Sequence, residues 1–139
     1  MTFIDSFLRT LRTFGAALPA VLGVILLLGL FRVFVTTELI SAVFSGEVFR
    51  DTVIGALFGS ISAGNAIASY IIGGELLKEG VSLFAIAAFI VAWVTVGVVQ
   101  FPAEAAILGR RFAAARNILA FLLALVVSIA TVTTVEVIL

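Results

Sequence analysis

The sequence predicts an all-α fold: a polytopic transmembrane helical bundle with an N-terminal amphipathic helix and about four membrane segments, the second (and in one reading the third) broken. Of its 139 residues, 63% are apolar and only 12% are charged, against about 45–50% and about 25% in soluble domains. A chain of 14.6 kDa has too much surface to hide so many apolar side chains from water. The apolar residues also gather in runs close to the roughly 20 residues that cross a bilayer. Lipid is therefore the expected solvent.

The composition excludes several classes of function. Eight basic and eight acidic residues cancel, so nothing attracts a nucleic acid backbone, and no nucleic acid partner is expected. The chain has no His and no Cys, which removes His-based catalysis, thiol chemistry and most zinc and copper sites. No HExxH, GxSxG or phosphate-cradling GxxxxGK[ST] motif occurs. We expect no enzyme, no catalytic residue, no metal site and no cofactor.

The first 35 residues predict an amphipathic interfacial helix over 1–14 and a membrane segment over 15–35. Apolar side chains recur at three- and four-residue steps, at Phe3, Ile4, Phe7, Leu8, Leu11 and Phe14. Residues 1–14 serve either as a membrane-surface anchor or as the solvated start of the first span. A signal peptide is the alternative, since Arg9 and Arg12 precede the apolar run. The run is long for that role and lacks a small-residue cleavage pattern, so we interpret it as a retained helix.

The second predicted membrane segment, residues 52–76, follows a charged connection at 36–51 that is expected to lie at the surface. Its middle, residues 59–65, reads Gly-Ser-Ile-Ser-Ala-Gly-Asn, a composition that weakens a helix. A break exposed to lipid would leave backbone N–H and C=O groups unpaired. Irregular backbone at this depth must therefore face protein or a water-filled cavity. The sequence leaves open whether the segment spans or turns back.

Two further membrane segments are predicted over 81–108 and 115–138. Pro102 removes a helical hydrogen bond and should kink or end the third segment. Counting Lys and Arg gives five against three between the two sides, whether all four segments cross or the second is re-entrant. Such a small bias permits insertion in both orientations and hence an antiparallel homodimer.

Small residues form two stripes that predict close helix packing. Gly55, Gly59 and Ala63 recur every four residues, as do Ala120, Ala124 and Ser128.

Candidate substrate-binding residues lie in the second and third segments. The broken segment offers hydroxyls, an amide and loosened backbone at Ser60, Ser62, Gly64, Asn65 and Ser69. Transporters bind solutes at such discontinuous helices, although the same groups also hydrogen-bond neighbouring helices in bundles. Gln100 and Glu104 share a helix face. Glu104 either serves the pathway or forms a structural ion pair with Arg111.

Two motifs stand out, Gly-Ala-Leu-Phe-Gly-Ser-Ile-Ser-Ala-Gly-Asn at 55–65 and Gly-Gly-Glu-Leu-Leu-Lys-Glu-Gly-Val-Ser at 73–82. Both resemble motifs of the predicted permease family that includes the organoarsenical effluxers (ArsP-like permeases). Many members carry a cysteine pair in the broken span, where this chain has none, so thiol-dependent arsenical handling is not implied. Members are about twice this length and contain two related halves. The resemblance therefore implies a half-size permease that pairs with a second copy or a sister half-subunit.

Our leading hypothesis is a half-size permease in the lipid bilayer of a prokaryotic cell (inner) membrane, multi-pass, which moves a small solute or ion. The alternative from another class is a non-transporting membrane scaffold or accessory subunit, in which the small stripes and polar residues only pack helices. A passive channel is a third interpretation, but no ring-forming charge pattern favours it.

Overall fold

The computed structural model describes residues 2–34 and 36–139, and the described part is all helical, with no β-strand. The all-α prediction is therefore confirmed. The expected bounds at residues 1 and 35 lie outside the described residues. The helices are α1 (Phe3–Phe34), α2 (Thr37–Val43), α3 (Val48–Ile61), α4 (Ala66–Lys78), α5 (Leu83–Thr95), α6 (Phe101–Leu108) and α7 (Arg110–Ile138).

The chain divides into two units, Met1–Thr36 and Thr37–Leu139, and each is described by itself. The first unit is the single helix α1 of 32 residues, which runs through Pro19. The amphipathic helix and the membrane segment expected within residues 1–35 form one continuous helix over the described residues, which fits the alternative that residues 1–14 are the start of the first span.

Two of the described helices, α1 and α7, are long and apolar enough to cross a membrane, fewer than the four segments expected. The difference arises because the predicted segments 52–76 and 81–108 are each divided into two helices. At 14 and 13 residues, α3 and α4 are about 20 Å long, against a hydrocarbon core of about 30 Å. The predicted breaks in the second and third segments are therefore present.

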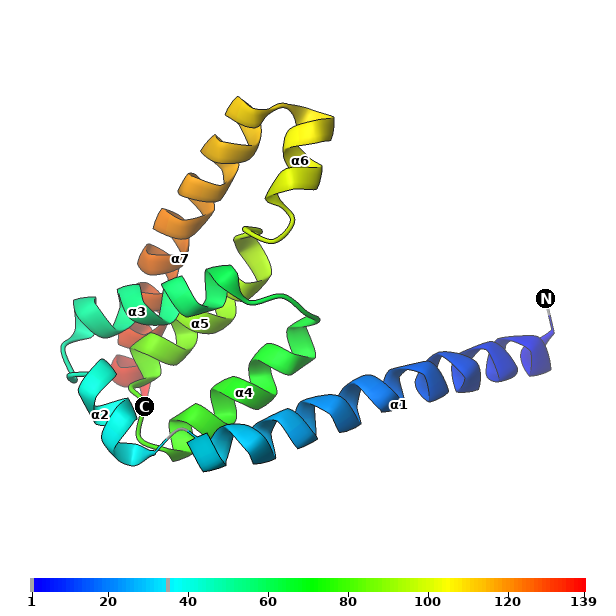
Figure 1. The fold of residues 1–139 in the computed structure, drawn as a ribbon, viewed down its shortest axis with the longest axis horizontal. Helices are drawn as coiled ribbons and strands as arrows, with labels where there is room; N and C mark the ends of the chain where they lie inside the picture. The colour runs from blue at the N-terminus through cyan, green and yellow to red at the C-terminus, as the bar shows by residue number, and fades with distance from the viewer. Residues whose placement is uncertain (1, 35) are drawn as a thin grey trace. The chain divides into compact units, whose positions relative to one another are not determined.

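Helix α5 lies at the centre of the second unit, where it packs against α3, α4 and α7 (Figure 1). Two glycines bring α3 against it. A Cβ atom at Gly55 would lie 2.1 Å from the carbonyl oxygen of Ala85, and one at Gly59 would lie 2.2 Å from that of Phe89. Glycine is thus required at both positions, and the prediction of close packing there is confirmed.

Helix α7 packs on the same core through its own small residues. Ala124 and Ser128 are fully buried, and Ala124 belongs to an apolar cluster with Ala56, Ala88 and Ala92. The second small-residue stripe therefore also packs helices, as predicted.

The connection at 36–51 lies largely at the surface, as expected. It also contains α2, and Asp51 in the first turn of α3 is only 1% exposed. Its carboxylate accepts hydrogen bonds from the backbone N–H groups of Ser45 (3.1 Å) and Gly46 (3.2 Å). These hydrogen bonds stabilise the buried carboxylate and fix the backbone that leads into α3.

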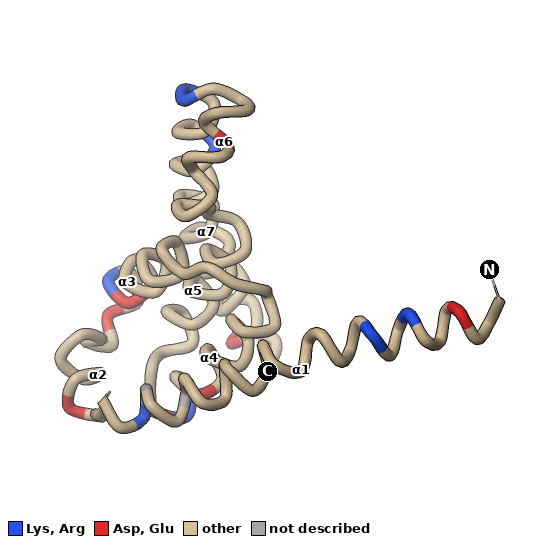
Figure 2. The backbone as a smooth tube through the Cα atoms, turned by 45° about the vertical axis from the view of Figure 1, so that its right-hand side comes forward, with Lys and Arg blue, Asp and Glu red and all other residues tan. Residues whose placement is uncertain are grey.

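Charged residues of the second unit lie at or near helix ends, and α5 carries none (Figure 2). After the last residue of α6, Gly109 takes a φ of +90° and turns the chain from α6 into α7. Glycine suits that left-handed conformation, which other residues rarely adopt. The turn lays α6 against the start of α7.

Candidate functional site

Residues 62–65 connect α3 to α4, which pack against α5 and not against each other. We call this connection the hairpin tip, because the chain turns back there. Gly64 has a φ of +152°, and a Cβ atom there would lie 3.1 Å from the ring of Trp93 in α5. The indole Nε1–H of Trp93 donates to the carbonyl oxygen of Gly64 (3.3 Å). Trp93 also packs edge-on against Phe89. Glycine therefore permits a close approach that holds the tip against α5.

A second interruption separates α5 from α6 at residues 96–100. Helix α5 ends at Thr95, and α6 begins at Phe101 with Pro102 in its first turn. Proline fits the first helical turn, where its missing N–H group would have no intrahelical partner. The third segment therefore breaks before Pro102, and the chain resumes as a helix at Phe101, one residue before the proline.

The hairpin tip and the interruption enclose a cavity of about 280 Å³. Its walls combine hydroxyl, amide and guanidinium groups with apolar side chains. The lining residues are Ser62, Ala63, Gly64, Ala66, Trp93, Val94, Thr95, Val96, Gly97, Val99, Gln100 and Arg116. Two stretches of irregular backbone thus meet at one polar pocket.

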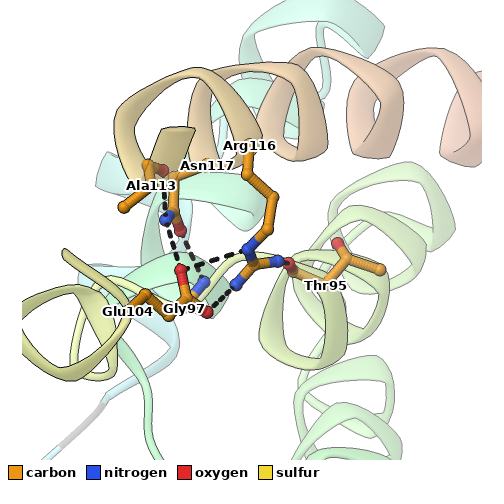
Figure 3. Close-up of polar contacts among 6 residues, drawn as sticks. All are labelled: Thr95, Gly97, Glu104, Ala113, Arg116 and Asn117. Atoms are coloured by element: carbon orange, nitrogen blue, oxygen red, sulfur yellow. Dashed lines mark hydrogen bonds and ion pairs between the residues drawn. The ribbon is translucent and has the colours of Figure 1, made fainter. Parts of the chain in front are cut away.

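One wall of the cavity is held by an ion pair between α6 and α7 (Figure 3). The guanidinium of Arg116 contacts both carboxylate oxygens of Glu104: Nε donates to Oε2 at 3.1 Å, and Nη2 pairs with Oε1. Its Nη1 donates to the carbonyl oxygen of Thr95 (3.1 Å), near the end of α5. One side chain therefore ties α5, α6 and α7 together, with the planar, two-point geometry that favours arginine.

Asn117 completes the network. Its side-chain oxygen accepts from the backbone N–H of Gly97 (2.8 Å), and its amide nitrogen donates to Glu104 Oε2 (3.2 Å) and to the carbonyl oxygen of Ala113 (2.9 Å). The unwound residues 96–100 thus receive a hydrogen-bond partner from α7, which such backbone requires away from water.

The structure brings only some of the predicted site residues together. Ser62, Gly64 and Gln100 line the cavity. Ser60 and Ser69 are buried, and each donates to a carbonyl oxygen of its own helix, that of Ala56 and Ala66 respectively (2.6 Å in both).

Glu104 belongs to the ion pair and is not among the cavity-lining residues. An ion pair was one of the two interpretations left open, but its partner is Arg116 rather than Arg111. Sequence reasoning missed Arg116, Asn117 and Trp93 as site residues. The glycine at 109 was the available signal for the first two, because a turn there places the start of α7 beside α6.

Asn65 acts at the cavity's edge as the N-cap of α4. Its side-chain oxygen accepts from the backbone N–H of Ile67 (2.6 Å). We expect Asn65→Leu to destabilise the protein by about 1 kcal/mol, since an unfavourable cap costs that much, and Asn65→Asp to retain most of the stability. Thermal unfolding followed by circular dichroism in one detergent measures both variants. Equal transition temperatures for the two variants would contradict the capping role.

Comparisons with known proteins leave the chain without an assigned relative: no protein-family model, curated protein or solved structure matches it. Within the described residues, no group of three or more His, Cys, Asp or Glu side chains is placed to hold a metal ion. The function is therefore inferred from the geometry of the cavity.

Proposed function

We propose that the chain is an integral membrane protein and one half of a solute permease, whose pathway runs through the cavity between the hairpin tip and the α5–α6 interruption. One observation carries this proposal: two separate breaks in helices meet at a single polar pocket. Irregular backbone is tolerated within a bilayer only where it faces protein or lines a water-filled cavity. Solute sites of secondary transporters are built from such discontinuous helices near the membrane midplane.

The membrane location is supported by the apolar composition and by the two long apolar helices α1 and α7. In the proposed membrane arrangement, α5 and α6 together form one membrane crossing that is interrupted between them. Helices α3 and α4 form a re-entrant segment that enters and leaves the bilayer on the same side. Charges near helix ends and an uncharged α5 fit that placement. The proposed membrane is the prokaryotic inner membrane.

A homodimer, antiparallel or parallel, or a pairing with a sister half-subunit, completes the proposed permease. Large apolar side chains on the hairpin face outward from the second unit, among them Phe58, Ile61, Ile67 and Tyr70. In the proposed dimer they contact lipid or the second copy. The near balance of positive charge between the two sides supports insertion in both orientations.

Cysteine accessibility tests the proposed pathway, because the chain has no cysteine of its own. We expect Ser62→Cys to react with a membrane-impermeant thiol reagent when the protein is in the membrane. Ser128→Cys is the matched control, since Ser128 is 0% exposed in the helix core. It should react only after denaturation. Labelling at position 62 that equals labelling at 128 would overturn the water-filled pathway.

The alternative function is a non-transporting scaffold or accessory subunit. One observation favours it: every buried side-chain nitrogen and oxygen in the described residues has a hydrogen-bond partner. A scaffold predicts that position 62 is sealed, so the same labelling experiment separates the two functions.

A further inference from the structure

The cavity is lined by one charged side chain, that of Arg116. The other polar contributions come from neutral groups, including the Ser62 hydroxyl and the Gln100 amide. Glu104, the counter-charge of Arg116, does not line the cavity, and the Glu104 side chain is 17% exposed against 35% for the Arg116 side chain. The ion pair therefore presents its cationic member to the pocket.

Helix ends contribute little net charge to the cavity. Helices α3 and α5 end beside it, whereas α4 and α6 begin there. A helix carries about half a positive charge at its N-terminus and half a negative charge at its C-terminus. Two ends of each kind largely offset one another, so the guanidinium sets the sign of the electrostatic potential.

The guanidinium of Arg116 also has unused hydrogen-bonding capacity. An arginine side chain carries about five N–H donors, and in the described residues three of those of Arg116 are engaged, two by Glu104 and one by the Thr95 carbonyl oxygen. The remaining donors belong to Nη1 and Nη2. These two nitrogens together match the two-point geometry of a carboxylate or other oxyanion.

Gly97 keeps the space beside the guanidinium open. A Cβ atom at this position would lie 3.1 Å from Arg116 Nη2 and 3.2 Å from Gln100 Oε1. The volume of about 280 Å³ lies at the lower end of the range for ligand pockets, about 300–1,000 Å³. The cavity therefore suits a small solute.

We propose that the cavity binds the anionic group of a small solute, a carboxylate or another oxyanion, through Nη1 and Nη2 of Arg116. Glu104 orients the guanidinium and is also its internal competitor, because its carboxylate engages two of the guanidinium donors and offsets part of the positive charge. This inference rests on the proposed permease function and names the class of solute that it carries.

The only tryptophan of the chain, Trp93, lines the cavity and reports on it. Its fluorescence in the full-length protein, in an uncharged detergent at constant ionic strength, can be quenched by iodide, by caesium or by neutral acrylamide. We expect the quenching constant of iodide to exceed that of caesium by about threefold or more, since a cationic pocket concentrates anions. Acrylamide should quench as well, because it measures access alone.

Three variants identify the residue responsible for the iodide preference. Arg116→Gln should bring the ratio of iodide to caesium quenching close to unity, whereas Arg116→Lys should retain the preference because it keeps the charge. Glu104→Gln should raise the ratio above that of the unaltered protein, because the competing carboxylate is gone. An ion pair whose guanidinium is sealed from the pocket predicts no rise. The Glu104→Gln measurement therefore decides the question even where Arg116→Gln folds poorly.

The outcomes separate the two proposals. Quenching by acrylamide together with equal quenching constants for iodide and caesium would overturn the proposed anion site. The proposal of a water-filled pathway would remain. A ratio that Glu104→Gln leaves unchanged would overturn the anion site too. No quenching by any of the three agents, together with an unlabelled cysteine at position 62, would overturn the permease pathway itself.

Discussion

Gly59→Ala is expected to separate α3 from α5 and to destabilise the protein by about 3 kcal/mol, the upper part of the range for an overpacked core. The added Cβ atom would lie 2.2 Å from the carbonyl oxygen of Phe89 and 3.1 Å from the Cβ atom of Ala92. The first obstacle is backbone, which cannot rotate away as a side chain can. Either α3 or α5 must move, and the hairpin tip against Trp93 moves with it.

Gly74→Ala is the matched control for this substitution. Both glycines lie within helices, so both replacements gain about 1 kcal/mol of helix propensity. A Cβ atom at Gly74 meets nothing within 4 Å. Circular dichroism during heating, in one detergent, should therefore show a lower transition temperature for Gly59→Ala and an unchanged or higher one for Gly74→Ala. Equal transition temperatures would mean that α3 does not approach α5 this closely.

The helix breaks and the close packing could be predicted from the sequence because their causes are local. Glycine and asparagine at 59–65 weaken a helix wherever it lies, and the observed break falls at residues 62–65. A stripe of small residues permits close approach whichever helix supplies the other face. Local composition could not identify α5 as that partner.

The polar network could not be predicted, because it depends on where the chain turns. On one uninterrupted helix, Arg111 would share a face with Glu104 two turns away. The turn at Gly109 reverses the chain, so the carboxylate of Glu104 meets Arg116 instead. The burial of Asp51 could not be predicted either, for a similar reason. Its burial follows from the fold of the neighbouring backbone, since its two donors are the N–H groups of Ser45 and Gly46.

The serines show why hydroxyl groups in a membrane segment are weak evidence of a site. The hydroxyls of Ser60 and Ser69 donate hydrogen bonds to carbonyl oxygens of their own helices, and both residues are buried by packing. Ser62 also donates to its own helix, to the carbonyl oxygen of Phe58 (2.7 Å), yet it lines the cavity because it follows the last residue of α3. Position relative to the break, rather than residue type, decides which hydroxyl reaches the pocket.

Arg116→Glu is expected to have the largest effect of any change in the polar network. It places a second carboxylate beside Glu104 and removes the donor to the Thr95 carbonyl oxygen. Like charges at this distance repel, and the surrounding protein screens them less than water does. The transition temperature should fall below that of either neutral variant, Glu104→Gln or Arg116→Gln. Size-exclusion chromatography should show a smaller fraction of monodisperse protein.

Exchange of the two charges tests whether the pair itself holds α6 against α7. Glu104→Arg combined with Arg116→Glu restores the attraction and should recover most of the transition temperature lost in Arg116→Glu alone. Lys78→Glu is the control, because Lys78 pairs with Glu75 at the surface, with its side chain 70% exposed. Exposed pairs contribute little to stability, so this reversal should be tolerated. A tolerated Lys78→Glu without recovery in the exchanged pair would assign the role of Arg116 to the Thr95 carbonyl oxygen instead of to Glu104.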